Sequence, residues 1–241
     1  MLGNPVKGGG YLLKGVNLLS EKKLRVFILV PLIINILLFS FALFMLFNQL
    51  PNWVDSWLSF LPDFLSFVEF ILYPLVALTA ALVVYYSFSL VANIIAAPFN
   101  GLLSERVEQL VAGKEVADES FSELMAIVPR AIGRELAKLA YYLPKLILVV
   151  IISIIPGLNL FAPIVWFVFG AWMMAVQYCD YPMDNNKVSF KDMISKLKKP
   201  RLTSLGFGGL VQLAMMVPIL NFFVMPVAVI GATLYWIEEH R

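Results

Sequence analysis

The chain has 241 residues, of which 61% are apolar and only 14% are charged, and its formal net charge is +2. Soluble domains carry about 25% charged residues, so roughly half of the usual surface charge is missing. This composition predicts an integral membrane protein. The small net charge argues against nucleic-acid binding, and one Cys179 beside one His240 leaves no disulfide and no metal or haem ligand set. We expect no cofactor.

The chain opens with a polar lead of about 25 residues. It does not read as a cleaved signal, because the apolar run after it is too long and no small-x-small cleavage site follows. Charge-free stretches then begin. Residues 26–47 and 70–97 each have the length of one membrane-spanning helix.

The charges around these two spans predict their orientation. Five Lys and Arg residues precede the first span, whereas residues 48–69 between the spans carry three acids and no base. The positive-inside rule therefore places this loop outside and both chain ends in the cytoplasm. Aromatic residues recur in the loop at helical spacing, which favours a helix lying in the membrane interface.

The sizeable polar segment, residues 99–143, is predicted to be cytoplasmic and amphipathic. A capping box at residues 120–123 predicts the start of a helix, with a kink at Pro129. On that helix Arg130, Arg134 and Lys138 stand at i, i+4 and i+8 and so form a basic stripe.

Two further apolar stretches, residues 144–179 and 202–237, are each too long for one helix and too short for two full spans. Pro156 and Pro218 break them at corresponding places, and an Asn follows each break. The pattern predicts two helical hairpins that enter the membrane from the cytoplasm and return to the same side. Ordinary, slightly short spanning pairs with kinks remain the alternative.

Together these elements predict an all-α integral membrane protein with a single membrane domain, residues 1–241. It would have two long transmembrane helices, two re-entrant hairpins and amphipathic interfacial helices.

Enzyme chemistry finds little support. A Gly-x-Ser-x-Gly motif is absent. Asp180 and Asp184 lie four residues apart, as an intramembrane aspartyl protease would require, but at the end of an apolar run we expect them to be solvated. We therefore predict that the protein is not an enzyme.

The sequence supports anion binding better than it supports an enzymatic reaction. The N-terminal segment combines Gly15, which allows close backbone approach, with Ser20, Lys22 and Arg25 just before the first span. Backbone N–H groups and a planar guanidinium suit an oxyanion. The alternative is that these bases only anchor the span to anionic lipid.

Polar residues inside the apolar runs, or at their ends, are candidates for lining a pathway. They are Asn35, Asn93, Asn100, Glu105, Arg106, Asn159 and Asn221. Each has a structural alternative: interhelical hydrogen bonds for Asn35 and Asn93, a solvated pair for Glu105 and Arg106, and helix capping for Asn159 and Asn221.

Four strings resemble the bacterial sulfate permease family CysZ, with similarity over nearly the whole chain. They are AAPFNGLL at residues 96–103, KLAYYLP at 138–144, QYCDYP at 177–182 and MPVAVIGAT at 225–233. The resemblance implies a homo-oligomeric protein of the bacterial inner membrane that admits sulfate for cysteine synthesis. It also implies two long spans and two partly penetrating hairpins.

The resemblance further implies sulfate binding by the segment that enters the first long helix. The matching positions here are Gly15, Leu18, Leu19, Ser20 and Arg25. Members of the family often have two adjacent arginines, whereas Val26 follows Arg25 in this chain. Lys22 and Lys23 are the candidates to supply the missing charge, without the bidentate fork of arginine.

We therefore expect a multi-pass sulfate permease or channel, with sulfate, the lipid bilayer and further copies of the chain as partners. No titratable residue lies inside the apolar runs, which favours a channel-like mode. The alternative is a non-transporting membrane-shaping or scaffold protein, for which wedge-like hairpins would suffice.

Overall fold

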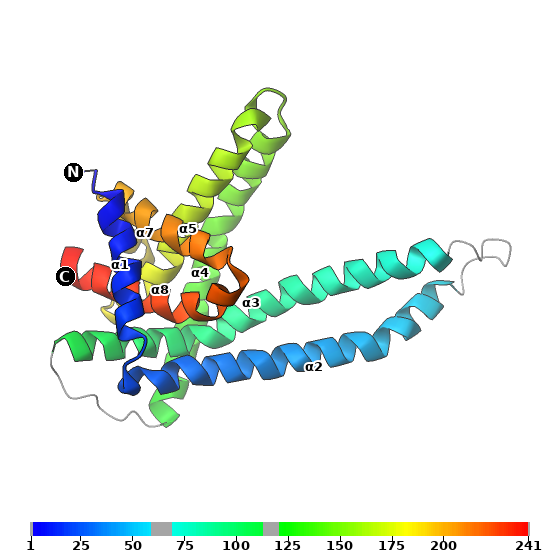
Figure 1. Ribbon diagram of the computed structural model, residues 1–241, viewed down its shortest axis with the longest axis horizontal. Helices are drawn as coiled ribbons and strands as arrows, with labels where there is room; N and C mark the ends of the chain where they lie inside the picture. The colour runs from blue at the N-terminus through cyan, green and yellow to red at the C-terminus, as the bar shows by residue number, and fades with distance from the viewer. Residues whose placement is uncertain (1, 59–68, 113–120, 241) are drawn as a thin grey trace. The chain divides into compact units, whose positions relative to one another are not determined.

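The computed structural model describes residues 2–58, 69–112 and 121–240 (Figure 1). Every regular element within those residues is a helix, which confirms the all-α prediction. In chain order the elements are α1 (Pro5–Leu18), η1 (Lys22–Leu24), α2 (Arg25–Leu58), α3 (Glu69–Val111), α4 (Phe121–Ile154), η3 (Leu158–Phe161), α5 (Ala162–Asn185), α6 (Phe190–Lys198), α7 (Arg201–Met215) and α8 (Pro218–Glu239).

The chain divides into two compact units, one of residues 30–96 and one of residues 1–29 with 97–241. The first unit holds most of α2 and α3, which run in opposite directions (Figure 1). The stretch Lys22–Trp53 is long and apolar enough to cross a membrane. Side chains such as Leu37 and Phe47 are largely exposed along it, so lipid or protein must cover them. The predicted spans 26–47 and 70–97 lie wholly within α2 and α3.

Both long helices continue beyond the predicted ends. α2 passes Pro51 and reaches Leu58, and α3 passes Pro98 and reaches Val111. On α3 the reason is burial, because Leu103 and Val107 lie one turn apart and are packed in the core. This apolar packing outweighs the hydrogen bond that a proline removes. Residues 99–111 are therefore the end of a long helix rather than part of a separate amphipathic segment.

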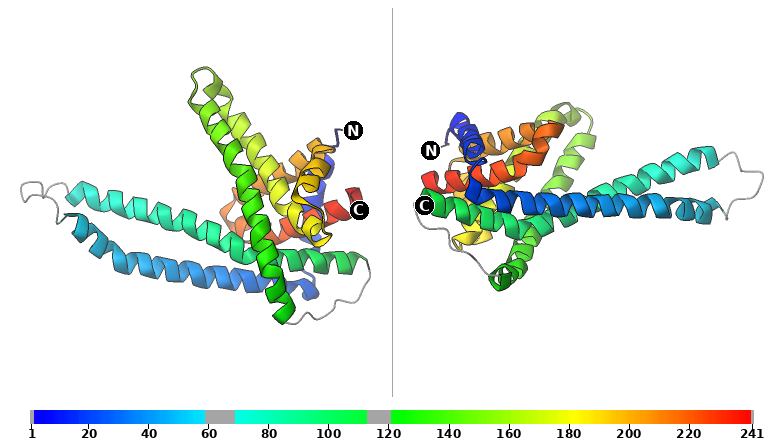
Figure 2. Two further views of the ribbon diagram at one scale, coloured as in Figure 1. Left: turned by 180° about the vertical axis from the view of Figure 1, so that it is seen from behind. Right: turned by 60° about the horizontal axis from the view of Figure 1, so that its bottom comes forward.

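No helix begins or ends at the predicted boundary between residues 143 and 144. α4 is one continuous helix that contains both Pro129 and Pro144. It pairs with α5 in a hairpin, which both views of Figure 2 show. Within this pair the stretches Val128–Ile154 and Leu158–Asn185 are each long and apolar enough to cross a membrane.

Helix breaks occur where the prolines predicted them. α4 ends before Pro156, and Gly157 adopts a positive φ of 85° in the turn to η3. α7 ends at Met215, and α8 begins at Pro218. Proline suits the first turn of a helix because its missing N–H is not needed there, and Pro163 plays the same part in α5.

α1 packs against both α7 and α8. Gly8 abuts the backbone of α7, and a Cβ on Gly15 would lie 2.5 Å from the carbonyl oxygen of Val227 on α8. Tyr11 is buried between these contacts and stacks on Tyr235 at 5.1 Å. The small residues let α1 approach closely, and this contact fixes where the chain enters α2.

Charged groups at the end of α8 form ion pairs with lysines of α1. Glu239 pairs with Lys7 and accepts a hydrogen bond of 2.9 Å from the Tyr11 hydroxyl. Glu238 lies 2.6 Å from the Lys14 ammonium. The hydrogen bond from Lys7, aided by Tyr11, lowers the pKa of Glu239 below its ordinary value.

Candidate functional site

The predicted anion-binding segment forms a tight turn between α1 and α2. Leu19 N–H donates to the Val16 carbonyl at 3.2 Å, and Glu21 N–H donates to the Leu18 carbonyl at 3.1 Å. The chain then enters η1 and passes directly into α2. The turn therefore ends at the N-terminus of a long helix, where the helix dipole favours an anion, while the N–H group of Arg25 donates to the Lys22 carbonyl.

Side chains at this turn are cationic and accessible. Lys22 and Arg25 are exposed, and the Arg25 guanidinium donates to the Ser20 carbonyl at 3.3 Å. This hydrogen bond folds the arginine back over the turn. Ser20 is exposed, Leu18 and Leu19 are half-buried, and Gly15 is buried against α8. The predicted residues thus lie together in one short stretch, and Gly15 is the residue that packs against α8.

Several predicted pathway residues fall elsewhere. The side chains of Asn35, Asn93 and Asn221 lie outside the part of the chain that the structure describes. Asn159 is exposed near the tip of the α4–α5 hairpin. It does not cap the returning helix, because the N-cap residue of α5 is Phe161. Asn221 does not begin α8 either, since that helix starts three residues earlier at Pro218.

Glu105 and Arg106 do not form the predicted solvated pair. Arg106 is only 2% exposed. Its guanidinium donates to the Gln109 side chain at 3.0 Å and lies 5.4 Å from the centre of the Phe27 ring. Glu105 is half-buried and accepts a hydrogen bond from the same Gln109. The aromatic contact takes the place of solvent around the arginine.

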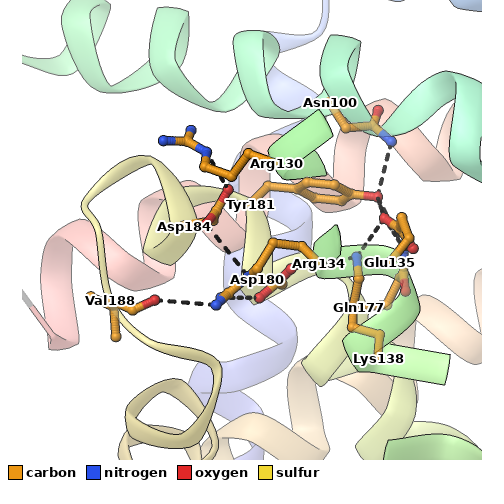
Figure 3. Close-up of polar contacts among 10 residues, drawn as sticks. All are labelled: Asn100, Arg130, Arg134, Glu135, Lys138, Gln177, Asp180, Tyr181, Asp184 and Val188. Atoms are coloured by element: carbon orange, nitrogen blue, oxygen red, sulfur yellow. Dashed lines mark hydrogen bonds and ion pairs between the residues drawn. The ribbon is translucent and has the colours of Figure 1, made fainter. Parts of the chain in front are cut away.

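A buried ion-pair network joins α4 to α5, and Figure 3 shows its members. Arg134 pairs with Asp180, and its Nε lies 3.5 Å from Asp184. Arg130 Nε lies 3.1 Å from Asp184. The Lys138 ammonium lies 3.5 Å from Asp180. The basic stripe of α4 therefore faces the two carboxylates of α5.

The deeper of the two carboxylates is not solvated as expected. Asp180 is 1% exposed, and Lys138 is 4% exposed. Charges at such depth persist only when they are paired, because leaving water costs each of them several kcal/mol. The ion pairs occupy the carboxylates, so they are poorly suited to act as the acid–base dyad of an aspartyl protease.

Neutral groups extend the network to α3. Glu135 accepts hydrogen bonds from Lys138 at 2.6 Å and from the Tyr181 hydroxyl at 3.2 Å. Tyr181 in turn accepts from Gln177 at 3.0 Å and from Asn100 at 3.3 Å. Asn100, a predicted pathway residue, is thus a buried member of this network, where its amide is satisfied.

Formally the network balances three cations, Arg130, Arg134 and Lys138, with three carboxylates, Glu135, Asp180 and Asp184. A pocket of about 20 Å³ lies among these side chains. It holds about one water molecule and is too small for a five-atom oxyanion. The network is closed to such an ion in this structure.

The sequence held a signal for this network. Bases at i, i+4 and i+8 on one helix match acids at i and i+4 on the helix that returns beside it. Across the described residues, no cluster of three His, Cys, Asp or Glu side chains is arranged to hold a metal ion.

These features define an α-helical integral membrane protein with a cationic turn at the start of a long helix and a buried ion-pair network between two others. The model of the family "Sulfate transporter CysZ/Etoposide-induced protein 2.4" matches residues 11–226, and the chain belongs to this family. The family is named for transport and not for an enzymatic activity.

The chain is similar to curated relatives over nearly its full length. The chain is 45% identical to the sulfate transporter CysZ of Pseudomonas aeruginosa, over 97% of this chain and 96% of the relative. It is 47% identical to the sulfate transporter CysZ of Vibrio parahaemolyticus, over 97% of this chain and 95% of the relative. It is 46% identical to the sulfate transporter CysZ of Vibrio atlanticus, over 98% of this chain and 94% of the relative.

Proposed function

We propose that this protein carries sulfate across the bacterial inner membrane, for assimilation into cysteine. The observation that carries the proposal is the exposed turn of Ser20, Lys22 and Arg25 at the N-terminus of α2. The names of the relatives supply the anion, since each is called a sulfate transporter. The exposed cations of the turn match the negative charge of an oxyanion such as sulfate.

Sulfate is a dianion at neutral pH, so it needs several hydrogen-bond donors and positive charges. The positive end of the α2 dipole attracts the dianion without adding a further cation that would bind it too tightly. Arg25 adds a planar fork that binds two oxygens, and Lys22 adds a point charge one turn before it. Binding of this moderate strength permits release, which transport requires.

We place both chain ends in the cytoplasm and propose that the helix pairs α4–α5 and α7–α8 are re-entrant. On α4 only nine residues lie between Lys145 and the end of the helix at Ile154. They span about 14 Å, about half of the hydrocarbon thickness. If the tip crossed to the far side, the Lys145 charge would lie at mid-membrane, where charges are costly. One protomer offers too few crossings to enclose a path, so we propose a homo-oligomer.

Uptake of radiolabelled sulfate into proteoliposomes tests the transport proposal. We expect uptake above that of empty liposomes, and a loss of most of it in Arg25→Ala. Arg25→Lys separates charge from geometry, since it should retain only part of the activity if two oxygens are bound at once. Arg201→Ala is the matched control, because Arg201 is an exposed arginine at the start of another helix.

Absence of uptake by a folded, correctly inserted protein would favour the scaffold alternative. Equal loss in Arg25→Ala and Arg201→Ala would mean that surface charge in general, and not the turn, attracts the ion.

A further inference from the structure

Glu21 is an acid in the middle of the cationic turn at the start of α2. Its side chain is exposed, as are those of the three bases that follow it, Lys22, Lys23 and Arg25. Three bases and one acid leave this stretch with two positive charges in excess, which equal the negative charge of one sulfate ion. An acid repels a dianion, so its place in the turn has a consequence for binding.

The adjoining helix does not use the Glu21 carboxylate as a cap. Glu21 is the N-cap residue of η1, but its side chain makes no capping hydrogen bond. The backbone is held instead, because the Glu21 N–H donates to the Leu18 carbonyl at 3.1 Å and the Glu21 carbonyl accepts from the Leu24 N–H at 3.0 Å. Leu24 is fully buried. The position of Glu21 in the turn is therefore fixed, while its carboxylate remains in solvent.

Arg25 lies within reach of this carboxylate. Its guanidinium donates to the Ser20 carbonyl at 3.3 Å, and that carbonyl belongs to the peptide group that joins Ser20 to Glu21. The exposed Glu21 side chain can therefore turn towards the guanidinium and accept a charge-assisted hydrogen bond from it. Exposed ion pairs of this kind are weak, so the contact forms and breaks readily.

The carboxylate also lies just before the N-terminus of α2. The helix dipole places a positive partial charge there, which attracts a carboxylate and a sulfate ion alike. Glu21 and a bound sulfate ion would thus use the same two attractions, the Arg25 guanidinium and the helix end. Because negative charges at one place repel, each anion weakens the binding of the other.

We propose that Glu21 sets the affinity of the turn for sulfate, by competing with the ion for Arg25 and for the positive end of α2. Sulfate displaces the carboxylate because it brings two negative charges against one. When the ion leaves, the carboxylate takes its place beside Arg25. The turn thereby holds sulfate weakly enough for release, which transport requires. This role of Glu21 rests on the proposed binding of sulfate at the turn.

Equilibrium binding of radiolabelled sulfate to the purified full-length protein tests the proposal. Glu21→Gln removes the charge and keeps the size of the side chain, so it should bind sulfate about fivefold more tightly at low ionic strength. The gain should shrink as salt is added. Glu21→Asp keeps the charge and should bind sulfate nearly as the wild type does.

A monovalent ion of the same shape separates electrostatic competition from a change in the structure of the turn. Perchlorate is tetrahedral like sulfate but carries a single negative charge, and displacement of radiolabelled sulfate measures its affinity. Since the repulsion by Glu21 scales with the charge of the ion, Glu21→Gln should tighten perchlorate binding by only about twofold. A reshaped turn would instead change both affinities alike.

Asp192→Asn is the matched control. Asp192 is an exposed acid in the first turn of another helix, α6. Its replacement changes the charge of the whole protein by the same amount as Glu21→Gln does. Both affinities should stay at their wild-type values in this variant.

Three results would overturn the role of Glu21: sulfate binding by Glu21→Gln that is no tighter than that of the wild type, an equal gain in Asp192→Asn, or equal tightening of sulfate and perchlorate. In each of these cases the wild type still binds sulfate, so the proposed function stands. A folded wild-type protein that binds no sulfate at all would overturn the proposed function and the role of Glu21 together.

Discussion

Among single residues, Asp180 and Asp184 differ chiefly in depth. Asp180 is 1% exposed and faces both Arg134 and Lys138. Asp184 is partly exposed, and its partner Arg130 reaches solvent. A buried charge that loses its partner stays desolvated, whereas an exposed one regains water. The same chemical change at the two positions should therefore have very different effects.

Replacing Asp180 with asparagine should destabilise the protein by about 3–5 kcal/mol, because Arg134 and Lys138 would lose a buried counter-charge. Asp184→Asn is the matched control and should cost about 1 kcal/mol or less. Thermal unfolding in detergent, followed by circular dichroism, measures both. Similar losses for the two variants would mean that the depth of the carboxylate does not govern the network.

His240 gives a pH dependence with a definite sign. Burial, aided by the positive charges of Lys196 and Lys199 and opposed by Glu239, lowers the pKa of His240 from 6.5 to about 4. As the pH falls through this window, the unfolded chain takes up the proton before the folded protein does. Stability should therefore decrease from pH 6.5 towards pH 4.

Unfolding temperatures measured across this range test the expectation. His240→Gln should flatten the curve between pH 6.5 and 4.5. The loss below pH 4.5 that comes from Glu239, whose pKa is lowered from that value, should remain. A wild-type curve that is already flat above pH 4.5 would contradict the account.

At the scale of elements, α1 connects the packed helices to the anion-binding turn. Its glycines fall into two kinds. A Cβ at Gly15 would collide with the backbone of α8, while a Cβ at Gly10 would meet no atom within 4 Å. Both residues lie in the same helix, so one substitution at each position separates packing from helix propensity.

Gly15→Ala should push α1 away from α8, at a cost of about 1–3 kcal/mol in stability, and should weaken sulfate binding at the turn that follows. Gly10→Ala should instead raise stability by up to about 1 kcal/mol, since alanine is the better helix former, and leave sulfate binding unchanged. Thermal unfolding and equilibrium sulfate binding to the purified variants measure the two effects. Unchanged binding by a folded Gly15→Ala protein would separate the turn from the packing of α1.

Helix breaks could be predicted from the sequence, but helix ends could not. Pro156 with Gly157, and Pro218, mark turns because the chain also changes direction there. Pro98 and Pro144 look the same locally, yet α3 and α4 run through them. Tertiary burial decides between these outcomes, and burial of residues such as Val107 is not visible in a local pattern.

Across the whole molecule, the candidate site was predictable only in part. The turn at Gly15–Arg25 is contiguous in the chain, so its members could be named from the sequence. The α4–α5 network joins residues about 46 positions apart, such as Arg134 and Asp180. Each looked solvated when considered alone, because its partner was on another helix. Only the packing of α4 against α5 shows that these residues form one ion-pair network.

Membrane topology is the remaining property of the whole molecule, and cysteine labelling tests it. Cys179 is fully buried, so the wild-type protein is the blank for a membrane-impermeant maleimide. Asn52→Cys, near the end of α2, should react from outside in spheroplasts. Ser195→Cys, on the outer face of α6, should react only in inside-out vesicles, because the Lys and Arg distribution places it in the cytoplasm.

Leu160→Cys decides between the two hairpin models. Leu160 is 78% exposed at the tip of the α4–α5 pair. In a re-entrant hairpin the tip ends within the hydrocarbon, so this cysteine should resist the reagent in spheroplasts as firmly as Ser195→Cys does. In a spanning pair it should react from outside at a rate near that of Asn52→Cys. The second result would move Lys145 to mid-membrane and would contradict the re-entrant topology.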